Sequence, residues 1–249
     1  MVLEAISSAA REVALRTLDE EDLEIAGHGL LDVVREWPFV KLIGLAAYSD
    51  SFSVIAESVL ADRRDALFRS LTSDIDKLKV IMRQNGVLLS GSRCLRHLDD
   101  EHDFTPGDWD WYVPDHGYDS FVAYLVEELG AKLVAETEDY RSVGDITVSE
   151  SAQAHGISRI GRFTVGPTSH DVIRSRSGCA ELPIVMFHST TVMNYLSADR
   201  IDIAYPYTFF GGVGIKAARW RTSTDEFALL KYRERGYTMV VDPPVELRK

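Results

Sequence analysis

The sequence predicts an α/β protein of the α+β type, in which helices flank a mixed sheet and an added helical region comes first. Apolar residues recur at helical spacing through the first 70 residues. Strand-like runs at 87–89 and 108–113 follow helical segments, and a hairpin pattern follows them. We therefore expect an N-terminal helical region over residues 1–70 and a sheet-containing domain over residues 71–249.

Helical patterns fill the chain up to its first strand. Pro38 is expected to end the second of two early helical segments, because proline interrupts helices. Asp74 is a good N-cap and Gly86 a good C-cap for the helix between them, which leads into the strand at 87–89. The helices expected here lie within residues 3–37 and over 52–70 and 75–85.

The second half of the chain alternates between strands and helices. Gly166 and Pro167 form a turn, so the strands on either side of it are expected to be antiparallel. Polar and glycine-containing segments at 136–156 and 211–222 are expected to be loops. The expected strands are 132–135, 157–165, 170–173 and 201–204, and the expected helices are 118–129, 190–196 and 224–235.

An Asp-Trp-Asp-Trp sequence at 108–111 carries the first candidate site. Alternate side chains of a strand share a face, so Asp108 and Asp110 point one way and the two tryptophans point into the core. Neighbouring carboxylates repel each other unless positive charge lies between them. Mg²⁺ or Mn²⁺ is the expected cation, because hard carboxylate oxygens suit such ions. The alternative is that both aspartates belong to the polar face of an edge strand.

The turn Ser90-Gly91-Ser92 precedes this strand and is the second half of the candidate site. Gly91 allows close approach of the backbone, and the helix start after it offers free N–H groups to an anion. We expect the turn to contact a triphosphate, although a plain turn is the alternative. Basic side chains that could reach the phosphates are Arg93 or Arg96, which could equally be solvated surface residues, then Lys231 and, ranked lower, Lys216.

Together these motifs resemble the nucleotidyltransferase superfamily related to DNA polymerase beta. The shared pattern is a strand, a Gly-Ser turn, a helix and a strand with Asp-x-Asp. Further segments resemble uncharacterised fungal nucleotidyltransferase-like proteins, so the resemblance covers residues 80–237. The downstream segments that carry it are 187–194, 205–206 and 231–236. One departure is the stretch 93–107 between the turn and Asp108, which is longer than usual for the superfamily.

The resemblance implies a nucleotidyltransferase fold and a metal-dependent activity. A nucleoside monophosphate would pass from a nucleoside triphosphate, such as ATP, to an acceptor hydroxyl by a two-metal mechanism. The superfamily uses a third carboxylate on a neighbouring strand, and Asp171 is the candidate here, with Asp108 and Asp110 as the other catalytic metal ligands. An aspartate that only caps the turn is the alternative, and Asp145 or Asp202 would then be the next candidates.

Composition narrows the expected partners and location. The formal net charge is −12 and the pI is near 5.0, which disfavours duplex DNA and favours a small molecule, a protein or a short RNA as acceptor. The sequence has no stretch of about 18 apolar residues, so no membrane span is expected. Two cysteines form no disulfide framework, which predicts a reducing, intracellular and cytoplasmic location.

Two rival functions stay open at this point. The protein could be a catalytically inactive nucleotide-binding or scaffold protein that keeps the fold, as the long stretch at 93–107 allows. It could also be a partner-binding module that uses its acidic surface, in which case it would bind no nucleotide. Metal-dependent consumption of a triphosphate distinguishes the enzyme from both.

Overall fold

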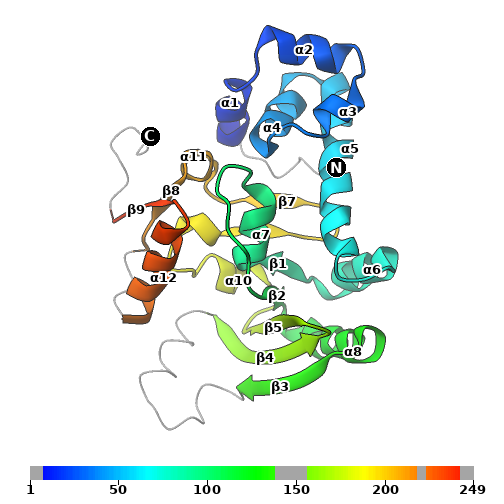
Figure 1. The fold of residues 1–249 in the computed structure, drawn as a ribbon. Helices are drawn as coiled ribbons and strands as arrows, with labels where there is room; N and C mark the ends of the chain where they lie inside the picture. The colour runs from blue at the N-terminus through cyan, green and yellow to red at the C-terminus, as the bar shows by residue number, and fades with distance from the viewer. Residues whose placement is uncertain (1–7, 138–155, 218–222, 242–249) are drawn as a thin grey trace.

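The α+β fold class is confirmed by a computed structural model, which describes residues 8–137, 156–217 and 223–241. Seven strands form a mixed sheet in the order β3-β4-β5-β2-β1-β6-β7, and β8 and β9 form a small second sheet (Figure 1). The strands are β1 (Leu88–Ser90), β2 (Trp109–Val113), β3 (Lys132–Thr137), β4 (Ile157–Val165), β5 (Thr168–Ser175), β6 (Asn194–Leu196), β7 (Ile201–Ile203), β8 (Val213–Ile215) and β9 (Thr238–Val240).

Helices surround this sheet and form the N-terminal part of the molecule. The N-terminal helices are α1 (Ser8–Leu15), α2 (Glu20–Gly27), α3 (Leu31–Val34), α4 (Phe39–Tyr48) and α5 (Asp50–Arg69). The later ones are α6 (Ile75–Asn85), α7 (Gly91–Leu98), α8 (Tyr118–Leu129), α10 (Glu181–Ile184), α11 (Pro206–Phe210) and α12 (Ser223–Glu234), with 3-10 turns η1 (Asp115–Gly117) and η2 (Thr190–Val192). No helix of the described residues is long and apolar enough to cross a membrane.

The first 70 residues are helical, as predicted, but the sequence analysis missed α4. Pro38 was expected to end a helix, whereas it stands at the N-terminal boundary of α4. Both positions suit proline, which lacks the N–H that a helix interior needs and the first turn does not use. The apolar side chains Leu42, Ile43 and Leu45 of α4 are almost completely buried. Burial of this apolar face therefore stabilises α4, which the sequence analysis did not predict because it took Pro38 as the end of a helix.

One continuous cluster of buried side chains joins the N-terminal helices to the sheet. It includes Phe39 and Leu42 from α4, and Leu89, Trp111 and Phe121 from the part after residue 70. The long helix α5 leads from the upper helices down to α6 beside the sheet (Figure 1). The division of the chain at residue 70 stays a prediction, but the two parts share this core.

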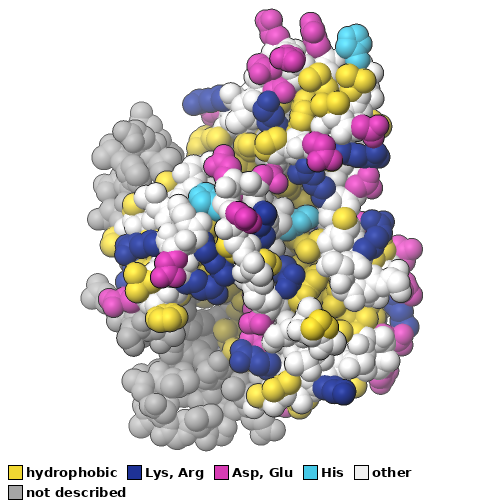
Figure 2. Space-filling view, in the orientation of Figure 1, with side chains coloured by type: hydrophobic (Ala, Val, Ile, Leu, Met, Phe, Trp, Pro, Cys, Tyr) yellow, Lys and Arg dark blue, Asp and Glu magenta, His cyan; other side chains and the backbone are white. Residues whose placement is uncertain are grey.

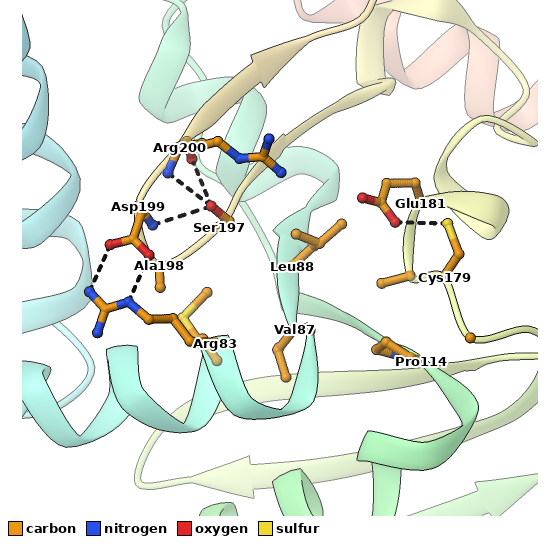
Figure 3. A pocket seen from close by; sticks show the side chains of 14 residues that line it. Arg83, Val87, Leu88, Pro114, Cys179, Glu181, Ser197, Ala198, Asp199 and Arg200 are labelled. Atoms are coloured by element: carbon orange, nitrogen blue, oxygen red, sulfur yellow. Dashed lines mark hydrogen bonds and ion pairs between the residues drawn. The ribbon is translucent and has the colours of Figure 1, made fainter. Parts of the chain in front are cut away.

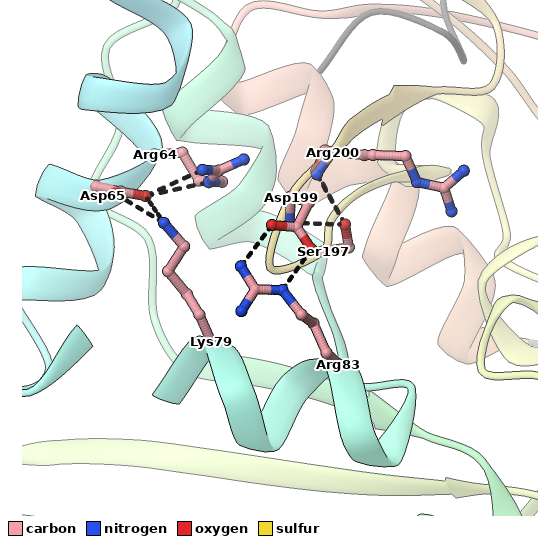
Figure 4. A network of polar contacts seen from close by, with 7 residues as sticks. All are labelled: Arg64, Asp65, Lys79, Arg83, Ser197, Asp199 and Arg200. Carbon is pink, nitrogen blue, oxygen red and sulfur yellow. Dashed lines mark hydrogen bonds and ion pairs between the residues drawn. The ribbon is translucent and has the colours of Figure 1, made fainter. Parts of the chain in front are cut away.

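Ion pairs fix α5 and α6 at the junction with the sheet. Arg83 donates to both oxygens of Asp199 at 2.7 Å, which ties the last turn of α6 to the β6–β7 connection (Figure 4). Asp65 of α5 accepts from Lys79 of α6 at 2.8 Å and from its own neighbour Arg64 at 3.1 Å. The hydrogen bond with Arg83 lowers the pKa of Asp199, so the pair stays charged across the neutral range.

Two elements differ from the sequence predictions in the C-terminal half. The predicted helix at 190–196 is wrong: Ser189 accepts a capping bond from the Thr191 N–H, but only the turn η2 follows. The strand β6 follows it because the edge of β1 needs a partner, and Leu89 lies opposite Leu196. The predicted loop at 211–222 contains β8, which pairs with β9 in parallel. Of the predicted loop at 136–156, the first two residues belong to β3, and 138–155 lie outside the described residues.

The long stretch between α7 and β2 is anchored by one buried carboxylate. Asp99 is 7% exposed and accepts from the backbone N–H of Glu101 and from both the N–H and the Nδ1 of His102. The hydroxyl of Tyr237, beyond α12, donates to the same carboxylate. The His102 and Tyr237 rings stack at 4.2 Å between centroids. Asp99 therefore joins the stretch at 93–107 to the C-terminal part of the molecule.

Replacement of Asp99 by alanine should destabilise the protein by about 2 kcal/mol or more. The change leaves the buried hydroxyl of Tyr237 and two backbone N–H groups without their acceptor. Urea unfolding compares the variant with Asp103→Ala, whose side chain is 99% exposed. We expect the control to stay within about 0.5 kcal/mol of the parent. Equal stability of the two variants would contradict the anchoring role of Asp99.

Candidate functional site

Strand pairing brings the predicted site residues to one edge of the sheet. In the antiparallel pair β1–β2, Ser90 lies opposite Asp110. In the parallel pair β2–β5, Asp110 lies opposite Asp171. Because directly opposed residues share a face, the carboxylates of Asp110 and Asp171 belong to the same side of the sheet. Two aspartates that are far apart in the sequence thus become neighbours, as the resemblance implied.

Gly91 allows the turn after β1 to approach Asp110 closely. Its φ angle is +70°, a region that residues with a side chain rarely adopt. A Cβ atom built on Gly91 would overlap Oδ2 of Asp110 and lie 2.8 Å from its Cγ. Glycine is therefore required here for both reasons, conformation and space. The first turn of α7, which begins at Gly91, is held directly beside the carboxylate.

A cavity of about 160 Å³ lies in front of this turn and contains most of the predicted site. Of the predicted residues, Asp108, Asp110, Gly91, Ser92 and Lys231 line it. The other lining residues are Gly107, Tyr112, Phe187, His188, Val192 and Tyr232.

The cavity walls include aromatic residues that the sequence analysis did not assign to the site. Tyr112 lies two residues after Asp110 on β2, so the alternation of side chains that paired the aspartates also predicts its position. Tyr232 follows Lys231 on α12, and its ring lies 5.6 Å from the ring of His188. The phenol pKa of Tyr112 is raised well above its usual value by burial and by the charge of Asp110. These side chains give the polar site a partly apolar wall.

The carboxylate of Asp110 is the most perturbed acid of the site. Burial raises its pKa to about 7, and the neighbouring charges of Asp171 and Asp108 act in the same direction. The cations Lys231 and Arg93 oppose this rise without cancelling it. Added positive charge next to Asp110 would therefore favour its ionised form.

Two basic side chains flank the carboxylates. Arg93, in the first turn of α7, lies over the Trp109 ring at 4.5 Å and donates to the carbonyl of Gly107 at 2.9 Å. Its buried Nε has no hydrogen-bond partner. Lys231 has a pKa lowered first by desolvation and then by Arg235, while Asp110 and Asp108 act to raise it. Figure 2 shows Lys and Arg side chains over α12, whereas acidic side chains gather over α2, away from the site.

Asp171 is adjacent to Asp110 but is bonded to an arginine. Arg162 of β4 donates from Nε to Oδ1 of Asp171 at 2.8 Å and from Nη2 to Oδ2 at 2.7 Å. The described residues contain no group of three His, Cys, Asp or Glu side chains that could hold a metal ion. Asp171, the residue predicted as the third metal ligand, therefore lies beside Asp110 on β5 with both of its oxygens paired to Arg162.

The remaining candidates lie outside the cavity. Ser90 is fully buried, and its hydroxyl donates to the carbonyl of Asn194 at 2.6 Å, which fastens β1 to β6. Lys216 is bridged to Ser189 and does not line the cavity. Asp202 lies on β7, separated from β2 by β1 and β6. Asp145 lies outside the described residues.

The opposite face of β2 and β5 is a stack of buried rings. Trp109 lies opposite His170, and their rings are parallel within 1° at 5.8 Å. Trp111 donates from Nε1 to Nδ1 of His170 at 3.1 Å, and Thr168 contacts the other ring nitrogen at 2.9 Å. Burial lowers the pKa of His170 to about 4, so the ring is neutral and can accept this bond. His170 thus acts as a core residue, with its neighbour Asp171 on the site face.

A larger cavity of about 650 Å³ lies at the other end of β1 and carries different chemistry. Figure 3 shows Val87, Leu88 and Pro114 between two polar walls. On one wall Arg83 is paired with Asp199, and on the other the Cys179 thiol donates to Glu181 at 2.9 Å. That hydrogen bond raises the pKa of Cys179 and disfavours a thiolate. We therefore place the candidate site in the smaller cavity, which Asp108 and Asp110 line.

Comparisons of the chain with protein-family models, with curated proteins and with solved structures gave no match.

Replacement of Gly91 by alanine should lower stability by about 1–3 kcal/mol, because a side chain at positive φ is strained and overlaps Asp110. The matched control is Gly107→Ala, which lies in the same cavity and has open space around its built Cβ. Urea unfolding of both variants measures the difference, with the control expected within about 0.5 kcal/mol of the parent. An unchanged Gly91→Ala variant would mean that the turn does not hold the close approach to Asp110.

Proposed function

We propose that the protein is a divalent-cation-dependent nucleotidyltransferase. The observation that carries this proposal is one cavity lined by Asp108 and Asp110, by the Gly91–Ser92 start of α7, and by Lys231. Carboxylates suit a cation, and the N–H groups of a helix start and an amine suit phosphate oxygens. A metal–triphosphate complex is the ligand that needs both kinds of group together.

The donor set fits a single Mg²⁺ or Mn²⁺ ion with a bound triphosphate. Such ions are commonly held by one or two carboxylates plus phosphate oxygens, and Asp108 and Asp110 provide that number. Burial first, and then the neighbouring carboxylates, raise the pKa of Asp110, and a cation bound beside it would oppose both effects. A cation bound there would offset the charge of the carboxylates and phosphates. Asp171, paired with Arg162, is not available in the same way.

The protein's own side chains would position the reactants. The N–H groups at the start of α7 and the Ser92 hydroxyl would donate hydrogen bonds to the triphosphate, with Lys231 and Arg93 supplying positive charge. The acceptor oxygen would attack the α-phosphorus, forming one P–O bond while the bond to pyrophosphate breaks. The hydroxyl proton would pass to a nearby carboxylate, for which Asp171 stays the predicted residue, or to solvent.

The acceptor would be a small molecule, a protein or a short RNA. The cavity of about 160 Å³ is small, and Lys231 of α12 lines it. The net charge of −12 opposes binding of duplex DNA through its backbone. Nucleotide base and acceptor would be distinguished by groups outside the carboxylate cluster.

One observation favours a second candidate function, that of an inactive nucleotide-binding protein. The bidentate bond between Arg162 and Asp171 occupies the carboxylate that the resemblance assigns to catalysis. A protein that binds a metal–triphosphate complex through Asp108 and Asp110 but leaves Asp171 paired could keep binding and lose turnover.

Asp110→Ala should reduce transfer at least about 100-fold, equivalent to about 2.7 kcal/mol, because the cation that positions the triphosphate loses a direct ligand. The protein is incubated with each labelled nucleoside triphosphate and Mg²⁺ or Mn²⁺. Released pyrophosphate and the masses of the protein and of any co-purified RNA are then measured. The matched control Asp103→Ala removes an exposed acid from the stretch before β2 and should retain full activity. Full activity of Asp110→Ala would exclude the assigned site.

A thermal scan of the parent protein separates the remaining functions. Binding of a metal–triphosphate complex at about 100 times its Kd should stabilise the folded protein by about 2.7 kcal/mol. Stabilisation with turnover supports the transferase, and stabilisation without turnover at any cation or acceptor supports the inactive nucleotide-binding protein. An unchanged melting temperature with every triphosphate and cation would contradict both and favour a partner-binding module.

A further inference from the structure

Asp171 has both of its carboxylate oxygens bonded to Arg162, a residue on the neighbouring strand. Within the described residues the two are directly opposed across the antiparallel pair β4–β5. Both bonds are short, at 2.8 and 2.7 Å, and join two nitrogens of the guanidinium to the two oxygens. Such fork-to-fork geometry is the strong form of an arginine–carboxylate bond. The Asp171 side chain is only 14% exposed, so water competes little for it.

The guanidinium of Arg162 also lies in the field of the other two carboxylates. Its pKa is raised by the hydrogen bond with Asp171 and further by the charges of Asp108 and Asp110. Arg162 therefore carries its positive charge at every physiological pH, and this charge is a permanent part of the acid cluster. A divalent ion that bound to Asp171 would be placed next to the guanidinium and repelled by it.

The donor set of the cluster then suits a single divalent ion. Three carboxylates, those of Asp108, Asp110 and Asp171, come together at this part of the sheet. Both oxygens of Asp171 are bonded to Arg162, which leaves Asp108 and Asp110 to face the cavity. One or two carboxylates plus phosphate oxygens commonly hold one such ion.

We propose that Arg162 occupies the place of a second metal ion, so that the site takes one divalent cation together with its triphosphate. This inference rests on the proposed function and specifies the number of metal ions that the site holds. Arg162 is a positioning residue: its guanidinium holds Asp171 beside Asp110 and keeps a fixed positive charge there. Removal of Arg162 should free Asp171 as a metal ligand and allow a second ion to bind.

The test counts Mn²⁺ ions bound to the folded protein, with α,β-methylene-ATP as the probe nucleotide that cannot be cleaved. Electron paramagnetic resonance measures free Mn²⁺ during a titration at saturating nucleotide and shows whether bound ions are coupled, as neighbouring ions about 4 Å apart would be. The parent should bind a single, uncoupled ion. Arg162→Gln should bind two coupled ions, because a neutral amide replaces the guanidinium beside Asp171.

Two further variants separate the proposed role from a general effect on β4. Arg159→Gln removes another arginine of the same strand, one that pairs with Glu136 at 3.2 Å, and should still bind a single ion. The double variant Arg162→Gln/Asp171→Asn should return to a single ion, because the second ion requires the Asp171 carboxylate. Melting temperatures of all variants verify that they are folded.

The outcomes distinguish this inference from the proposed function on which it rests. Two ions in the parent, or a single ion in folded Arg162→Gln, would overturn the proposed role of Arg162. The proposed function would not be affected, because the nucleotide analogue would still bind. If the parent bound neither Mn²⁺ nor the nucleotide analogue, the proposed function would be overturned, and this inference with it.

Discussion

The structure of the candidate site depends on one constraint: a buried carboxylate needs positive charge or hydrogen-bond donors around it. Asp110 meets this constraint incompletely. It lies against Gly91 on one side and Asp171 on the other, and its pKa is raised to about 7. Arg162 neutralises Asp171, and Arg93 and Lys231 lie near without a bidentate bond to Asp110. The ionised form of Asp110 is thus disfavoured by burial and by its acidic neighbours.

Buried aromatic packing on the opposite face of the same strands holds the aspartates in place. Trp109, Trp111 and His170 form a buried stack on the face opposite the aspartates, and the Trp111–His170 hydrogen bond satisfies the polar atoms within it. The stack fixes the register of β2 against β5, and this register sets the position of Asp171 beside Asp110. A one-residue shift would turn the carboxylates into the core and the rings into the cavity. Apolar packing on one face therefore maintains electrostatic strain on the other.

Much of this arrangement is predictable from local sequence, and the rest depends on pairing between distant strands. The alternation of 108–111 gave the correct faces, and Gly166 gave the hairpin. The pairing of Arg162 with Asp171 is predictable from the same hairpin. If Val165 lies opposite Thr168, the residues three positions further from the turn on each strand are Arg162 and Asp171. The helix predicted at 190–196 failed for a different reason. Ser189 does cap a turn, but the residues after it pair with β1 as a strand. That pairing depends on a strand about 100 residues earlier in the chain, which the local sequence pattern does not include.

The long stretch at 93–107 connects these local features to the C-terminal helix. Asp99 holds His102 and Tyr237, and Phe104 in the same stretch lies 4.2 Å from the guanidinium of Arg235. Tyr237 and Arg235 directly follow α12, the helix that carries Lys231 to the carboxylates. A shorter connection between α7 and β2 would lack these contacts, which add to the buried Leu229 and Tyr232 in holding α12. The stretch at 93–107 therefore contributes to the position of α12, and with it of Lys231 at the cavity.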